Sequence, residues 1–288
     1  MAKEMINSPL LILKNKIING TRLMLVHKLP GIVPFFMVTE YPKSGGTWLG
    51  QLLSGYFNIQ FPQNTFPKVG MSIVHGHYLP SGTSEKIKKI FWLVRDGRDV
   101  MVSSYYYFLI PNRENRQNPK DMKYYRSRLR FKDFENIREN LPEYIEFCFT
   151  HKPSLFNRFA FEGNWSSFNK KWHDYELKHE AEGNIMKISY ESLLNDTGKE
   201  LARMVRWVTD EKIDLKRIGE VVVRYGFEAQ SGRKPGIEDK NSFLRKGISG
   251  DWENKFSREA AEIFDHYAGE MLIEEGYEKN REWTKGIK

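Results

Sequence analysis

The feature of this sequence that most restricts its fold is an apolar run that ends in a glycine turn and continues into an amphipathic segment. Residues 32–39 are apolar and partly β-branched, which predicts a buried strand. Gly45 and Gly46 form the turn, and the apolar side chains of residues 48–57 recur at helical spacing. This order of strand, tight turn and helix is the repeating unit of an α/β fold.

The same pattern continues along the chain. Apolar runs bounded by turn residues predict three more strands, at residues 72–75, 89–95 and 184–190. Helical spacing predicts three more helices, one that runs to Phe108 and two at residues 198–208 and 257–272. Because there is no internal repeat, we expect residues 1–288 to form a single α/β domain. Its central parallel sheet would be flanked by helices, with a P-loop-like nucleotide site at the carboxyl ends of the strands.

The charge balance favours an anionic partner. Lys and Arg number 45 against 37 Asp and Glu, which gives a formal charge of +8. Residues 111–133 hold eight basic and three acidic residues between Pro and Asn breakers, so they account for most of the excess. We interpret this segment as a mobile basic insertion. The Gly- and Ser-containing stretch 229–250 is typical either of a loop over a ligand or of an ordinary surface connection.

The cysteine content and the hydropathy indicate a soluble protein of a reducing compartment. Cys148 is the single cysteine, so an intrachain disulfide is excluded, and no Cys/His group has the spacing of a metal site. The longest uncharged stretch, residues 44–67, is interrupted by polar residues and Pro. We therefore expect a cytoplasmic protein with no transmembrane segment and no cleaved signal.

The glycine turn carries the residues of an anion-binding site. Its consecutive backbone N–H groups and the adjoining helix N-terminus form a nest for phosphate. Lys43 adds a charge, and Ser44 and Thr47 add hydroxyl donors. A turn that merely needs glycine is the alternative, and the neighbouring Lys favours the functional interpretation. The loop is not a Walker loop, because Lys43 precedes Gly45 and Gly46 instead of following them.

Residues 41–48, Y-P-K-S-G-G-T-W, resemble the phosphosulfate-binding loop of the cytosolic sulfotransferase family, usually Y-P-K-S-G-T-T-W. Enzymes of that family use the sulfate donor PAPS and release PAP. The resemblance implies that the loop binds this donor through Lys43, Ser44, Gly45, Gly46, Thr47 and Trp48. Gly46 replaces a Thr of the family pattern. One hydroxyl is thereby lost, but the backbone donor is kept, so we expect donor binding to survive.

Two further motifs follow in the order that the family shows. Arg95 and Ser103, eight residues apart, resemble its 3′-phosphate motif, and both can converge on one dianion near a helix N-terminus. Residues 245–252, R-K-G-I-S-G-D-W, resemble its R-K-G-x-x-G-D-W signature and add Arg245, Lys246 and Gly247 to the donor site. The resemblance also implies that Tyr190 and Phe227 flank the adenine ring, whereas periodicity alone would place both in the core.

A histidine is the candidate base, because a neutral imidazole can take a proton from an acceptor hydroxyl. In the family the corresponding segment commonly reads K-T-H-x-P, with that His as catalytic base. This chain reads H-G-H-Y-L-P, so His77 takes the position of the base and His75 falls where a Lys is usual. We favour His77, with His75 as the alternative.

The resemblance implies transfer of a sulfuryl group from PAPS to a hydroxyl or amine of a small-molecule, lipid or glycan acceptor. His77 would deprotonate the acceptor and Lys43 would stabilise the leaving oxygen, without a metal. A nucleotide kinase is one alternative, because a strand that ends in Asp96 mimics a Walker B motif. A non-catalytic binder of nucleic acid or of an anionic membrane, acting through residues 111–133, is another.

Two features remain outside the three motifs. We interpret residues 111–133 as a lid over the acceptor pocket, and a loop that binds a surface is the alternative. Nucleic acid is not expected as a partner. The family's dimerisation segment, K-x-x-x-T-V-x-x-x-E, corresponds to residues 253–262, which match it poorly. The family dimer is therefore not expected to carry over, and the oligomeric state stays open.

Overall fold

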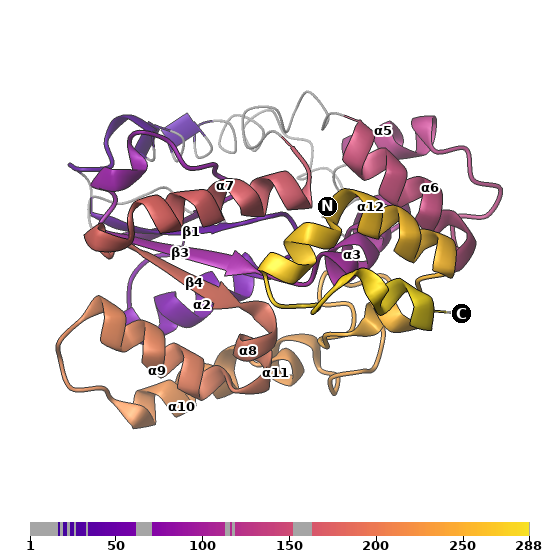
Figure 1. Ribbon diagram of the computed structural model, residues 1–288. Helices are drawn as coiled ribbons and strands as arrows, with labels where there is room; N and C mark the ends of the chain where they lie inside the picture. Colours follow the sequence, from indigo (N-terminus) through magenta and orange to yellow (C-terminus); the bar gives the residue numbers. More distant parts are fainter. Residues whose placement is uncertain are drawn as a thin grey trace. The chain divides into compact units, whose positions relative to one another are not determined.

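The computed structural model in Figure 1 describes residues 17, 20–21, 24–25, 27–32, 34–61, 71–112, 116, 119–151 and 163–287. These residues divide into two compact units, each built from three stretches of the chain. Unit 1 contains the described residues of 1–40, 45–93 and 174–225. Unit 2 contains residues 41–44 and the described residues of 94–173 and 226–288.

Unit 1 is organised around a four-stranded sheet with the strand order β2-β1-β3-β4. β1 (Phe35–Glu40) pairs in parallel with β2 (Ser72–Gly76) on one side and with β3 (Lys89–Val94) on the other. β4 (Ile185–Ser189) forms the edge beside β3. Every residue of β1 is buried, as expected for a central parallel strand. The predicted α/β class with a parallel sheet is confirmed.

Helices of unit 1 cover the sheet with apolar side chains. α2 (Gly46–Phe57) follows β1 directly and buries Leu49, Leu52 and Leu53 completely. These leucines share one core with strand residues and with the helices after β4. Unit 1 also contains η2 (Ser84–Lys86), η3 (Glu180–Glu182), α8 (Tyr190–Asn195), α9 (Thr197–Val208) and α10 (Leu215–Tyr225).

Unit 2 is mainly helical and has an aromatic core. Two residues separate β3 from α3 (Gly97–Leu109), and the second of them, Asp96, caps the helix by accepting the Arg98 N–H. Unit 2 also contains α5 (Lys120–Arg128), α6 (Ile137–Thr150), α11 (Phe227–Ser231), η4 (Asp251–Asn254), α12 (Arg258–Glu274) and η5 (Arg281–Gly286). α7 (Trp165–Lys178) begins in unit 2 and ends in unit 1. Its Trp165 is buried and donates to the Arg95 carbonyl.

The basic segment at residues 111–133 is partly helical, because α5 lies within it. Tyr125 of α5 stacks on Phe108 at 4.7 Å between ring centroids, and Arg126 donates to the Leu109 carbonyl. These contacts fasten the helix to the end of α3. The interpretation of the segment as a lid stays a prediction. In the described part of the chain, no helix combines the length and the apolar character needed to cross a bilayer.

Candidate active site

The glycine turn lies between β1 and α2, where the sequence places it. Gly45 is the N-cap of α2 and has φ +106°, a conformation that a side chain would strain. A Cβ atom at this position would also lie 2.8 Å from the Tyr190 ring. Gly45 is therefore required on two counts, and its backbone can lie directly against Tyr190.

Part of the predicted donor site gathers in unit 1. Tyr190, the first residue of α8, is buried, and the Trp48 ring meets it edge-on at 6.0 Å between centroids. Thr47 lies half-buried in the first turn of α2. The structure thus brings Gly45, Trp48 and Tyr190 together at the N-terminus of one helix. The adenine-binding role of Tyr190 stays a prediction.

Glu40, the last residue of β1, lies outside every motif and is not found by sequence reasoning. Its buried carboxylate accepts the Gly46 N–H at 2.5 Å and contacts His75 Nε2 at 3.0 Å. Burial raises the pKa of Glu40, but the hydrogen bond from His75 and the charges of His75 and His77 outweigh it, so the pKa is lowered. The amide of Gly46, predicted to bind the donor, therefore donates to a carboxylate here. An acidic residue at the end of an apolar strand is the signal that could have revealed it.

The two candidate histidines differ in their hydrogen bonds. His77 Nδ1 donates to the Glu40 carbonyl at 2.9 Å. Because a carbonyl only accepts, Nδ1 carries the proton and the neutral ring keeps its basic lone pair on Nε2. His75 lies beside it, with 6.0 Å between ring centroids, but directs Nε2 to the Glu40 carboxylate. The geometry therefore gives His77 the tautomer of a base and makes His75 a partner of Glu40.

Lys43 and Ser44 belong to unit 2. The Lys43 ammonium lies 4.0 Å from the centroid of the Tyr107 ring and 4.1 Å from that of Phe243, so two aromatic faces hold it. Ser44 is 1% exposed, and its hydroxyl has no hydrogen-bond partner among the residues that the structure describes. A buried hydroxyl in this condition fits a site for a polar ligand. Tyr107 follows the second motif, whereas Phe243 stands in a loop and carries no sequence signal.

Arg95 connects two of the three motifs within unit 2. Its guanidinium donates to the Lys43 carbonyl at 3.1 Å and to the Ile248 carbonyl at 3.3 Å. Asp99 lies 3.8 Å from Arg95 and accepts the Gly250 N–H at 2.7 Å. Arg95, predicted to bind a phosphate, is thus also the residue that fastens the Lys43 turn to the 245–252 segment.

The basic residues of the third motif are paired. Asp251, which is 1% exposed, contacts Arg245 at 2.6 Å and Lys246 at 2.5 Å. Burial raises the pKa of Asp251, but the hydrogen bonds and charges of Arg245 and Lys246 outweigh it, so the pKa is lowered. Arg245 also pairs with Glu238 and stacks over the Tyr106 ring at 4.5 Å. The two cations are therefore fixed in place before any ligand arrives.

The remaining predicted residues of unit 2 are Gly247, Phe227 and Ser103. Gly247 has φ +66°, and a Cβ atom there would lie 2.4 Å from the Phe227 ring, so the ring packs on bare backbone. Phe227 is the first residue of α11, and Ser103 lies half-buried on α3. The structure brings Phe227 and Gly247 together.

We expect replacement of Asp251 by Asn to destabilise the protein by about 1–3 kcal/mol at neutral pH, because charged hydrogen bonds are lost. The pKa of Asp251 is lower in the folded than in the unfolded protein, so its ionised form adds to the free energy of unfolding. This stabilisation is fully present above the ordinary Asp pKa of about 4 and is lost as the pH falls through the folded-state pKa. Urea denaturation across this range checks it. A variant whose stability falls on acidification as steeply as that of the wild type would contradict the assignment.

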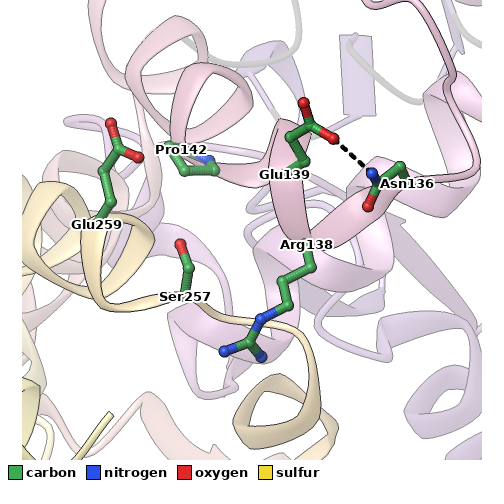
Figure 2. Close-up of a pocket in the computed structure, with 6 residues that line it drawn as sticks. All are labelled: Asn136, Arg138, Glu139, Pro142, Ser257 and Glu259. Carbon is green, nitrogen blue, oxygen red and sulfur yellow. Dashed lines mark hydrogen bonds between the residues drawn. The ribbon is translucent and has the colours of Figure 1, made fainter. Parts of the chain in front are cut away.

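A separate pocket in unit 2 contains none of the predicted site residues. Figure 2 shows it at the N-terminal ends of α6 and α12, lined by Asn136, Arg138, Glu139, Pro142, Ser257 and Glu259. Its single Arg is offset by two Glu residues, and Glu139 accepts a hydrogen bond from Asn136. This charge balance does not suit a polyanionic nucleotide.

Comparison with known proteins decides the family. The model of a family described as "Sulfotransferase domain" matches residues 60–276, a span that begins after the glycine turn. The chain belongs to the sulfotransferase family. Human sulfotransferase 2A1 is 23% identical over 274 residues, which cover 83% of this chain and 84% of that protein. Rat sulfotransferase 1E1 is 24% identical over 278 residues, which cover 82% of each.

Solved structures of the sulfotransferase fold agree. The crystal structure of mouse sulfotransferase SULT7A1 complexed with PAP has a TM-score of 0.59 and 19% identity, and covers 89% of this chain and 91% of that one. Retinol dehydratase in complex with androsterone and PAP has a TM-score of 0.57 and 16% identity, and the match covers 89% of this chain and 85% of that one. The chain is a sulfotransferase, an enzyme that transfers a sulfuryl group. The kinase and the non-catalytic binder are not favoured.

Proposed function

We propose that this sulfotransferase uses PAPS as its donor and sulfates a hydroxyl or amine of a small-molecule acceptor, with PAP as the second product. The observation that carries the proposal is the loop at residues 41–48. It presents the Y-P-K-S-G-G-T-W sequence at a strand–turn–helix junction, in a chain whose fold matches structures that hold PAP.

The residues at the predicted donor positions fit a nucleotide that carries several phosphate groups. The buried Ser44 hydroxyl has no hydrogen-bond partner in the described part of the chain, and Gly45 has no side chain that would cover the backbone of the turn. Arg245 and Lys246 supply two cationic side chains that Asp251 holds in place. The residues proposed to bind the donor are Lys43, Ser44, Gly45, Gly46, Thr47, Trp48, Arg95, Ser103, Tyr190, Phe227, Arg245, Lys246 and Gly247. The donor itself supplies an activated sulfuryl group.

The acid–base chemistry is assigned to His77 and Lys43. His77 Nε2 takes the proton of the acceptor O–H or N–H, and the acceptor atom forms the new bond to sulfur. The bond between sulfur and the bridging oxygen of the 5′-phosphosulfate breaks, and its electron pair stays on that oxygen. Lys43 stabilises the negative charge that develops there. The aromatic contacts from Tyr107 and Phe243 restrict the Lys43 ammonium to few positions.

The finer assignments extend the proposal. No metal takes part, because Lys43, Arg95, Arg245 and Lys246 provide the positive charge for the donor. A cytoplasmic location is proposed on the cysteine content, with Cys148 as the single thiol. Phenols, alcohols, lipids, glycans and amines all stay open as acceptors, since variable loops set pocket shape in such enzymes.

We expect PAP to stabilise the purified protein by roughly 2.7 kcal/mol at about 100 times its dissociation constant, because a ligand that binds only the folded state adds to its stability. A thermal-shift titration measures this, with and without EDTA, and ATP with magnesium serves as the control ligand. Stabilisation by PAP that EDTA leaves unchanged supports the donor site, and turnover of PAPS with a panel of acceptors then tests the transfer. A response to ATP with magnesium and none to PAP would contradict the proposal.

A further inference from the structure

Two residues of unit 1 depart from the family pattern, and the structure links them through a third, Glu40. Gly46 stands where the family loop has Thr, and His75 stands where a Lys is usual. The Glu40 carboxylate contacts both of them, at the Gly46 N–H and at His75 Nε2. A Cβ atom at Gly46 would lie 2.5 Å from His75 Nε2 and 2.7 Å from the Glu40 carboxyl carbon. The Glu40–His75 pair thus fills the space of the missing side chain, so the three residues fit as a set.

Glu40 also contacts the candidate base. Its backbone carbonyl accepts the His77 Nδ1–H, and its carboxylate charge interacts with His77 as well as with His75. The Glu40 side chain is 5% exposed, so solvent screens this interaction little. One residue at the end of β1 therefore holds the base through its main chain, and its carboxylate contacts the neighbouring His75, whose ring lies 6.0 Å from that of His77 between centroids.

We propose that Glu40 is a positioning residue for sulfuryl transfer: its carbonyl fixes the tautomer and orientation of His77, and its carboxylate stabilises the imidazolium that His77 becomes. This inference rests on the proposed role of His77 as the base. When the acceptor proton moves to Nε2, the ring becomes positively charged while its Nδ1–H stays on the Glu40 carbonyl. A negative charge held beside the ring favours that change. His75 keeps the carboxylate in place by occupying Oε1.

The titratable groups around His77 support an assignment to Glu40. The carboxylate comes from the end of β1, and His75 comes from β2 with its ring edge-on to that of His77. Tyr78, the next residue, is buried, and its ring packs on Gly76. Of these groups Glu40 is the acid whose ordinary pKa makes it anionic at neutral pH, and the net effect of its surroundings lowers that pKa.

The test replaces Glu40 by Gln, which keeps the size of the side chain and removes its charge. We expect the pKa of the His77 imidazole to fall by about one unit in the ligand-free protein, and kcat at neutral pH to fall by about tenfold, the rate equivalent of one unit. NMR titration of the histidine ring protons, assigned with a His77→Gln variant, gives the first quantity. PAP is an anion, so removal of a negative charge from the protein should not weaken its binding electrostatically. The PAP dissociation constant should therefore rise by no more than about threefold.

Glu182→Gln is the matched control. It removes another carboxylate of unit 1 that contacts a histidine, since Glu182 lies 3.2 Å from His179 Nδ1. This variant should leave the His77 pKa, kcat and PAP binding unchanged. An unshifted His77 pKa in Glu40→Gln would overturn the inference, and so would loss of PAP binding equal to the loss of kcat, which would make Glu40 a support of the loop alone.

A second pair of variants keeps the inference falsifiable if Glu40→Gln folds poorly. Gly46→Thr should lower kcat strongly in the wild type, because the new side chain collides with the Glu40–His75 pair. The same substitution in a Glu40→Ala background should cost less, since the carboxylate that the new side chain meets at 2.7 Å is then absent and His75 is released from it. Equal losses in both backgrounds would show that the three residues are not a set. A wild-type protein that binds no PAP and sulfates no acceptor would instead refute the proposed function, while the NMR titration would still report on Glu40.

Discussion

Replacement of His77 by Ala is expected to lower kcat by about 10²–10⁴-fold, the usual contribution of a general base. The effect follows from the tautomer that the structure fixes: Nδ1 donates to the Glu40 carbonyl, so Nε2 is the atom that accepts the proton. Nothing in this role involves donor binding, so the PAP dissociation constant should change little. Initial rates with saturating PAPS, together with calorimetry of PAP binding, measure both quantities.

His75 provides the internal control for this prediction. It is two residues from His77 and in ring contact with it, but its Nε2 faces the Glu40 carboxylate. His75 affects the reaction only through Glu40. His75→Ala should therefore lower kcat by less than about tenfold. If His75→Ala were the more damaging variant, or if His77→Ala retained nearly normal turnover, the base would have to be reassigned.

The parts of the site that depend on local sequence could be predicted. The turn at Gly45, the strand before it and the helix after it follow from glycine spacing and apolar periodicity, and the structure reproduces them to within a few residues. Most boundaries moved by one to three residues, as two elements illustrate. The first strand begins at Phe35 and extends to Glu40, and the helix predicted from residue 257 begins at Arg258, after Ser257 as its N-cap.

The parts that depend on tertiary contacts could not be predicted. Glu40 reaches His75 across 35 positions of sequence, and Phe243 meets Lys43 across a still longer separation. A single sequence gives no signal for such pairs, because each residue alone resembles an ordinary surface or strand-end residue. Asp251 is a similar case. The residue belongs to a recognised motif, but its pairing with both Arg245 and Lys246 becomes visible only in the structure.

Helices α5, α6, α7 and α10 were not predicted either, and composition explains the first two. α5 is strongly polar and has no buried residue, so its periodicity is weak. α6 contains Pro142, which ordinarily argues against a helix interior. Its burial of Tyr144 and Ile145 shows that packing of the apolar face outweighs that cost.

Replacement of Arg98 by Met is expected to lower the free energy of unfolding by about 3–5 kcal/mol, the cost of removing one partner from a buried ion pair. Arg98 is 2% exposed and contacts Asp96 at 2.7 Å and Glu278 at 2.5 Å. Its guanidinium also stacks over Trp252 at 3.8 Å and over Trp283 at 4.7 Å. Methionine can keep some of the aromatic contact but leaves two carboxylates without their cation.

Arg258→Met is the matched control for this prediction, because it makes the same chemical change at the surface. Arg258 and Glu262 form an exposed pair one helical turn apart in α12, with side chains 66% and 55% exposed, so its loss should cost less than about 1 kcal/mol. Urea denaturation of both variants measures the difference. Equal losses would mean that burial does not set the value of the Arg98 pairs. A large loss in Arg98→Met alone would show that the R-D-G-R-D segment stabilises unit 2 by joining the start of α3 to residues 252, 278 and 283.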